Sequence, residues 1–164
     1  KEGLDIGEKQ LTKPAKMEIL SKRECFLTIT EGKFHQVKRM FHKLGKEVVY
    51  LKRVAMAGIK LEDSLEKGQW RPLTENEIRQ IVLLQIKSVQ KMLAENGVEL
   101  EMTDAALNFL SQVGYDPEFG ARPVKRAIQR YLLNDLSKKL LAQEVDRSKA
   151  IIVDAGGDGL VFRN

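Results

Sequence analysis

The sequence of 164 residues contains a single cysteine, few aromatic residues and no long apolar run. Cys25 lies in a segment of alternating apolar residues, so no disulfide framework is possible and a buried, inert thiol is favoured over a catalytic one. The longest apolar runs, at residues 81–84 and 150–153, fall far short of the ~20 residues that a membrane-spanning helix needs. No charged-then-apolar leader is present either, so we expect a cytoplasmic protein.

The composition is that of a globular protein, with 43% hydrophobic and 31% charged residues. The charge is unevenly distributed, because residues 1–71 hold 16 basic and 10 acidic residues whereas residues 72–164 hold 12 and 13. A basic first half suits a polyanionic partner such as RNA, although a scattered positive surface is also common in ordinary globular proteins. The chain begins at Lys1 without an initiator Met, so we expect a fragment, a trimmed polypeptide or a processed product.

The first seventy residues predict mixed β structure with one helix. Apolar residues alternate at 17–20 and 25–31, which predicts two strands. Helical spacing follows at 34–44, with Gly45 as the C-cap, and a segment rich in Val and Tyr at 47–57 predicts a further strand.

After Pro72 the pattern becomes mainly helical. Thr74 and Glu77 form a capping box at the start of an amphipathic helix that Asn96-Gly97 ends. The remaining predicted elements follow in chain order: a strand at 98–102, a helix capped by Thr103 at 104–113, a turn at Asp116-Pro117, a long helix at 121–142, and a hairpin of strands 150–154 and 160–163.

Residues 31–41 (EGKFHQVKRMF) place a glycine turn before a basic helix start. Backbone N–H groups at a helix N-terminus, with Lys33, Lys38 and Arg39 beside them, can hold a phosphate or a carboxylate. A solvated basic helix is the alternative interpretation of the same residues.

This stretch, together with other short segments, resembles the RsuA/RluB-type pseudouridine synthases over residues 1 to about 78. The matching segments are residues 11–15 (LTKPA), 31–41, 50–53 (YLKR) and 68–74 (GQWRPLT), with Gly58 and Leu65. The resemblance implies a mixed-β catalytic domain in which an Asp attacks the uridine and a basic residue pairs with it.

By position in the motif, the resemblance gives that pairing role to Lys38, with Arg39 as the next candidate. It also implies that Lys33, His35 and Gln36, together with Lys38 and Arg39, shape the site and contact RNA. The family's catalytic Asp lies upstream in a G-R-L-D segment, and nothing similar occurs here, since residues 3–6 (GLDI) lack the Arg. Only the downstream half of a catalytic domain is therefore expected. No other metal-ligating residues accompany His42 at a suitable spacing, so the sequence predicts no metal site there.

A second motif lies at residues 114–128 (GYDPEFGARPVKRAI), where a turn ends in Gly120 and a helix carries Arg122 and Pro123 in its first turn. From the pattern alone, Arg122 is interpreted as an ordinary surface arginine. The string also resembles the C-terminal small domain of ClpB-type disaggregases, whose order of helix, strand, helix, long helix and hairpin matches residues 78–164.

The ClpB resemblance implies that Arg122, within the Gly120-Ala121-Arg122 motif, reaches the γ-phosphate of ATP bound in the second nucleotide-binding domain. The other parts of an ATP site are missing, because the sequence has no G-x-x-x-x-G-K-[ST] loop and no apolar strand ending in paired carboxylates for Mg²⁺. Residues 156–159 (GGDG) predict a hairpin turn and not a phosphate loop.

Together these patterns predict an α+β chain of two parts, a pseudouridine synthase fragment at 1–74 and a ClpB-type small domain at 75–164, with residues 72–78 fitting both patterns. We expect no complete active site and no cofactor in this chain; ATP, Mg²⁺ and a hexameric ring belong to full-length ClpB. Two alternatives stay open: an RNA pseudouridine synthase completed by a separate part that supplies the Asp, and a plain RNA-binding module.

Overall fold

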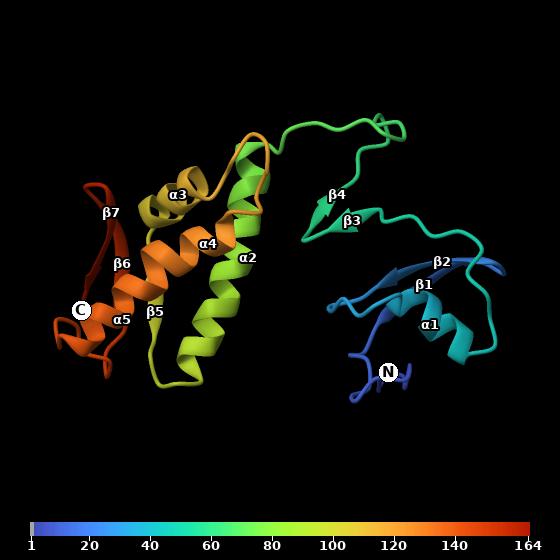
Figure 1. Ribbon diagram of the computed structural model, residues 1–164, viewed down its shortest axis with the longest axis horizontal. Helices are drawn as coiled ribbons and strands as arrows, with labels where there is room; N and C mark the ends of the chain where they lie inside the picture. The colour runs from blue at the N-terminus through green and yellow to red at the C-terminus, as the bar shows by residue number, and fades with distance from the viewer. Residues whose placement is uncertain (1) are drawn as a thin grey trace. The chain divides into compact units, whose positions relative to one another are not determined.

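The computed structural model describes residues 2–164 and divides them into two compact units (Figure 1). The first unit ends at Lys52, and the second runs from Arg53 to Asn164. This division follows contacts within the folded chain. The domain boundary between residues 74 and 75 follows sequence resemblance and stays a prediction.

The first unit is a β-hairpin followed by a helix. Strands β1 (Lys16–Ser21) and β2 (Glu24–Thr28) pair antiparallel, and α1 (Gln36–Lys43) follows them, so both strands and the helix form where the sequence predicts them. Gly45 adopts a left-handed φ of 68° directly after the C-cap residue Leu44, as the predicted helix end requires.

The first unit has few buried side chains. Among its described residues only four side chains are buried, and two of them are polar: Ile6, Thr12, Gln36 and Met40. A core this small stabilises a fold weakly.

The strand predicted at residues 47–57 is wrong for most of its length. Only β3 (Ala55–Met56) forms, paired with β4 (Ile59–Lys60) across a tight turn in which Ala57 and Gly58 both have positive φ. Val49 in the preceding segment is 92% exposed. A strand is held by hydrogen bonds to a neighbouring strand, and no strand within residues 2–164 pairs with residues 47–53, so a high content of Val and Tyr does not suffice.

The second unit begins with helix α2 (Glu75–Ala94), whose capping box is complete: Thr74 Oγ1 accepts from Glu77 N at 3.3 Å, and Glu77 Oε2 accepts from Thr74 N at 2.8 Å. Strand β5 (Leu100–Met102) leads into α3 (Asp104–Val113). Thr103 caps α3 through a bond from Ala106 N at 3.2 Å. Both predicted caps are confirmed.

The predicted long helix forms over residues 124–141, but its middle is wider than an α-helix. It consists of α4 (Val124–Ala127), the π-helical segment η1 (Ile128–Leu133) and α5 (Asn134–Leu141). Buried residues recur every four positions along it, at Val124, Ile128, Leu132 and Leu136. Because an α-helix has 3.6 residues per turn, a wider turn keeps side chains spaced by four on the core face for longer.

The second unit closes with the predicted hairpin of β6 (Ile151–Gly156) and β7 (Gly159–Arg163), joined by Gly157-Asp158. The sheet order is β5-β6-β7, with β5 parallel to β6. All members of the core cluster lie within the second unit, on the helices, the sheet and the segments between them: Val82, Ile86, Val98, Leu100, Ala106, Leu107, Leu110, Val124, Ile128, Leu132, Leu136, Val145, Ile151, Val153, Leu160 and Phe162. The second unit therefore has a complete core of its own.

The chain is α+β, as predicted. Within residues 2–164, the helices are too short or too polar to cross a bilayer.

Candidate functional site

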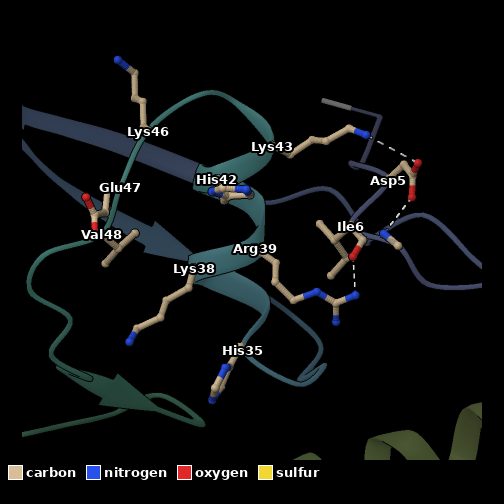
Figure 2. A pocket seen from close by; sticks show the side chains of 11 residues that line it. Asp5, Ile6, His35, Lys38, Arg39, His42, Lys43, Lys46, Glu47 and Val48 are labelled. Atoms are coloured by element: carbon tan, nitrogen blue, oxygen red, sulfur yellow. Dashed lines mark hydrogen bonds and ion pairs between the residues drawn. The ribbon is translucent and has the colours of Figure 1, made fainter.

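A basic pocket of about 530 Å³ lies in the first unit, beside α1 (Figure 2). Its charged and imidazole groups come mostly from α1 and the residues on either side of it, with one carboxylate from the N-terminal segment: Asp5, His35, Lys38, Arg39, His42, Lys43, Lys46 and Glu47. Positive groups outnumber the two carboxylates. The pocket is therefore suited to an anionic ligand.

Two lysines of the pocket remain unpaired. Within the described part of the chain, neither Lys38 nor Lys46 has a carboxylate within ion-pair distance. By contrast, Lys43 Nζ lies 3.7 Å from Asp5 Oδ2. The bond from Gly7 N, and then the charge of Lys43, lower the pKa of Asp5. Figure 2 shows Lys38 and Arg39 extending from α1 in different directions, with Arg39 toward Ile6.

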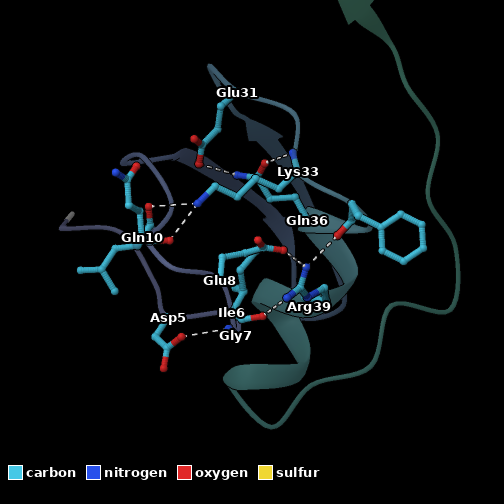
Figure 3. A network of polar contacts seen from close by, with 11 residues as sticks. Asp5, Ile6, Gly7, Glu8, Gln10, Glu31, Lys33, Gln36 and Arg39 are labelled. Atoms are coloured by element: carbon cyan, nitrogen blue, oxygen red, sulfur yellow. Dashed lines mark hydrogen bonds and ion pairs between the residues drawn. The ribbon is translucent and has the colours of Figure 1, made fainter.

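Arg39 holds the N-terminal segment against α1 (Figure 3). Its guanidinium donates to Glu8 Oε1 at 2.7 Å, to the carbonyl of Phe34 at 3.2 Å and to the carbonyl of Ile6. Through the first of these bonds, Arg39 lowers the pKa of Glu8. The arginine that the motif offered as a second pairing candidate thus has a structural role here.

Lys33 and Gln36 are also engaged within the unit and do not line the pocket. Gln36 is only 3% exposed; its Oε1 accepts from Lys33 N at 2.9 Å and its Nε2 donates to Glu31 Oε1 at 3.1 Å. Lys33 Nζ donates to the carbonyls of Gln10 at 2.8 Å and Leu11 at 3.3 Å, as Figure 3 shows. Of the five residues predicted to contact RNA, the structure brings His35, Lys38 and Arg39 together at one pocket.

Sequence reasoning missed several members of this site. His42, Lys43 and Lys46 line the pocket, and the ring of Phe34 stacks on His35 at its edge. The sequence contains a signal that could have identified His42. The basic and imidazole side chains follow the i, i+3, i+4, i+7 spacing of one helix face, at His35, Lys38, Arg39 and His42.

A second pocket, of about 560 Å³, lies in the second unit around the loop that carries Arg122. Gly120 and Arg122 line it, whereas Ala121 packs against the core cluster. Hydrogen bonds close this loop: Asp116 and Gly120 exchange two backbone bonds at 3.0 and 2.6 Å, and the Asp116 carboxylate accepts from Glu118 N at 2.8 Å and Phe119 N at 3.0 Å. Gly120 has a left-handed φ of 62° that this turn needs.

The Arg122 side chain is exposed, and within residues 2–164 it has neither a hydrogen-bond acceptor nor a carboxylate partner. The other arginine of the pocket, Arg71, is bound to Glu62 and Glu77. Arg122 therefore offers its full donor capacity to a ligand or partner.

The described residues do not fit a complete Mg²⁺–ATP site. They contain no group of three or more His, Cys, Asp or Glu side chains placed to hold a metal ion. Of the two arginines that line the second pocket, Arg71 is paired with carboxylates and Arg122 is not, and Glu118 is the only acidic side chain in that lining.

Comparison with known proteins divides the chain as the motifs do. Residues 73–153 match the family described as the C-terminal, D2-small domain of ClpB protein. The chaperone protein ClpB of Bacteroides thetaiotaomicron is 95% identical over 93 residues, and that of Porphyromonas gingivalis is 50% identical over 93 residues; each match covers 57% of this chain and 11% of the relative.

The N-terminal region matches a different protein. The ribosomal small subunit pseudouridine synthase A of Haemophilus influenzae is 54% identical over 76 residues, which is 46% of this chain and 33% of the synthase. The chain thus spans about a tenth of its ClpB relatives and a third of this synthase. One polypeptide therefore joins an N-terminal segment similar to pseudouridine synthase A to a C-terminal segment that matches the D2-small domain of ClpB.

Proposed function

We propose that the second unit acts as the nucleotide-sensing small domain of a ClpB-type disaggregase, with Arg122 directed at the phosphates of a nucleotide that another domain binds. The observation that carries the proposal is the exposed guanidinium of Arg122, which has no partner within residues 2–164, on a loop held by the Asp116 carboxylate. A guanidinium that serves stability is normally paired, and a loop closed by its own hydrogen bonds supports one that must meet a phosphate in a defined geometry.

The isolated chain is not expected to use ATP. A single charged hydrogen bond contributes about 1.5 to 3 kcal/mol, which corresponds to an affinity no better than roughly millimolar. A phosphate-cradling loop and Mg²⁺ would have to come from the rest of a ClpB ring. Ring formation and cytoplasmic location stay predictions.

The test is a hybrid in which residues 73–164 replace the corresponding domain of the Bacteroides ClpB relative. We expect the hybrid to hydrolyse ATP, and Arg122→Ala to lower the rate roughly 10-fold or more, as loss of a charged hydrogen bond predicts. Arg126→Ala is the matched control, because Arg126 is exposed on α4, directly after the loop that carries Arg122, and does not line the pocket. Equal rates for the two variants would contradict the role of Arg122.

A second function, RNA binding by the first unit, is supported by the unpaired Lys38 and Lys46 at the basic pocket. Lysines without carboxylate partners keep their charge for phosphates, and each phosphate contact to a single strand contributes about −0.7 to the slope of log affinity against log salt. The double variant Lys38→Met, Lys46→Met should therefore weaken binding of a labelled RNA oligonucleotide and reduce that slope by about 1.4. An unchanged slope would show that these lysines do not contact phosphate.

A further inference from the structure

An exposed pair of stacked rings borders the basic pocket. The Phe34 and His35 ring centroids lie 4.0 Å apart with the planes 16° from parallel, and Phe34 is nevertheless 75% exposed. One face of the Phe34 ring thus lies against the imidazole while the other is open to solvent. We propose that this open face is a stacking platform for one unpaired base of a single-stranded RNA, an inference that rests on the RNA binding proposed above.

The platform is held in place by the backbone around it. His35 adopts a left-handed φ of 49°, which is uncommon for a residue other than Gly, and it occupies the N-cap position of α1. The carbonyl of the preceding residue, Phe34, accepts a bond from Arg39 Nη1 at 3.2 Å, and Arg39 is itself anchored on Glu8 at 2.7 Å. Arg39 is a positioning residue, because its guanidinium holds the Phe34 backbone and donates its hydrogen bonds to groups within the first unit.

Charge and stacking occur together at this edge of the pocket. Lys38 follows His35 by three residues, which places both on the same side of α1, and both line the pocket. An aromatic face beside an unpaired lysine is the arrangement that single-strand binders use, since the ring stacks a base while the cation binds its phosphate. A lone exposed phenylalanine would need no explanation, but here the ring is backed by the imidazole of His35, which lines the same pocket as Lys38.

The platform selects single strands. In a duplex both faces of a base are already stacked on its neighbours, so a protein ring can reach a base only where the strand is unpaired. The pair should therefore contribute to binding of an oligouridylate and not to binding of a hairpin stem, whereas Lys38 should contribute to both.

The test measures fluorescence anisotropy of the full chain with a labelled 12-nucleotide oligouridylate and with a labelled RNA hairpin whose two strands are joined by a non-nucleotide linker, so that every base is paired. Phe34→Leu removes the ring and keeps an apolar side chain; Phe34→Tyr keeps the ring. Phe26→Leu is the matched control, because Phe26 is also exposed in the first unit and does not line the pocket.

We expect Phe34→Leu to weaken oligouridylate binding roughly 5- to 150-fold with an unchanged salt slope and to leave hairpin binding within about twofold. Phe34→Tyr and Phe26→Leu should bind like the unaltered chain.

The outcomes separate this inference from the proposal on which it rests. If the unaltered chain binds the oligouridylate and Phe34→Leu binds it equally well, RNA binding stands and the platform is refuted. If Phe34→Leu weakens the oligouridylate and the hairpin to the same degree, the platform is also refuted, because the loss is not specific to unpaired bases. If the unaltered chain binds neither RNA, both proposals fail.

Discussion

Arg71 holds the carboxylate of Glu77 with both terminal nitrogens, at 2.8 and 2.7 Å, across the start of α2. The same carboxylate accepts from Thr74 N at 2.8 Å and closes the capping box, and Arg71 also donates to Glu62 at 2.7 Å. Arg71 precedes the residues that match the ClpB domain, and Glu77 lies within them. One bidentate ion pair thus fixes the chain where the two sequence resemblances meet.

This pair predicts a pH dependence. The bond from Arg71, and then the bond from Thr74 N, lower the pKa of Glu77 from 4.5 to about 2. A carboxylate whose pKa falls on folding adds stability above its unfolded value, so the contribution is present above pH 4.5 and is lost as the pH falls toward 2. Urea unfolding between pH 2 and 6 should show this loss, and Glu77→Gln should flatten that part of the profile. Identical profiles for the two proteins would contradict the assignment.

The helix caps should carry measurable stability. Thr74→Ala and Thr103→Ala each remove a cap oxygen and should lower the free energy of unfolding by about 0.5 to 2 kcal/mol. Thr103→Ala should have the larger effect, because its hydroxyl also donates to Asp154 Oδ1 at 2.7 Å. Thr→Ser at each position keeps the oxygen and is the control. Chemical denaturation that shows Ala and Ser variants equally stable would disprove the capping role.

Substitution of a core residue in the second unit should lower its stability far more than substitution of the exposed Arg122. Leu132 is 0% exposed on η1, so Leu132→Ala should cost about 2 to 5 kcal/mol through lost burial and a residual cavity. Arg122→Ala should change stability by no more than about 0.5 kcal/mol, because the side chain is exposed and unpartnered within residues 2–164. Denaturant midpoints measure both, and a large loss for Arg122→Ala would make it a structural residue.

Pseudouridine formation should not occur with this chain alone. The resemblance to pseudouridine synthases implies that an Asp attacks the uridine, and Lys38 cannot act as that nucleophile. The two carboxylates that line its pocket are Asp5 and Glu47, and Asp5 is bound to Gly7 N and Lys43. Ribosomal RNA incubated with the purified chain and then chemically derivatised should show no new pseudouridine. A new modified position would contradict this prediction and establish that the chain contains an active site.

Local signals in the sequence predicted the second unit well. Thr74, Glu77 and Thr103 identify helix starts through bonds to their own neighbours, and Gly157-Asp158 joins two strands only two residues apart. These interactions are short in sequence, so the pattern alone contains both partners. The π-helical turn at Ile128–Leu133 was not predicted, because its spacing of buried residues differs little from that of an α-helix.

The first unit was harder to predict because its contacts are long in sequence. Arg39 reaches Glu8 and Ile6, more than thirty residues away, and Lys33 reaches Gln10 and Leu11. No periodicity reveals such pairs, so the sequence could not show that Lys33 and Arg39 also have partners within the unit. The strand prediction for residues 47–54 was wrong for a related reason. A high strand propensity does not provide a neighbouring strand with which the segment can pair.

Thermal unfolding of residues 70–164 beside the full chain tests most directly whether the second unit folds on its own core. This fragment keeps Arg71 with Glu77 and every member of the core cluster. We expect a single cooperative transition whose midpoint lies within about 4 °C of the main transition of the full chain, a shift equivalent to roughly 1 kcal/mol or less in a domain of this size. A fragment that melts without a cooperative transition, or far below the full chain, would contradict the claim that the chain contains a self-contained second domain.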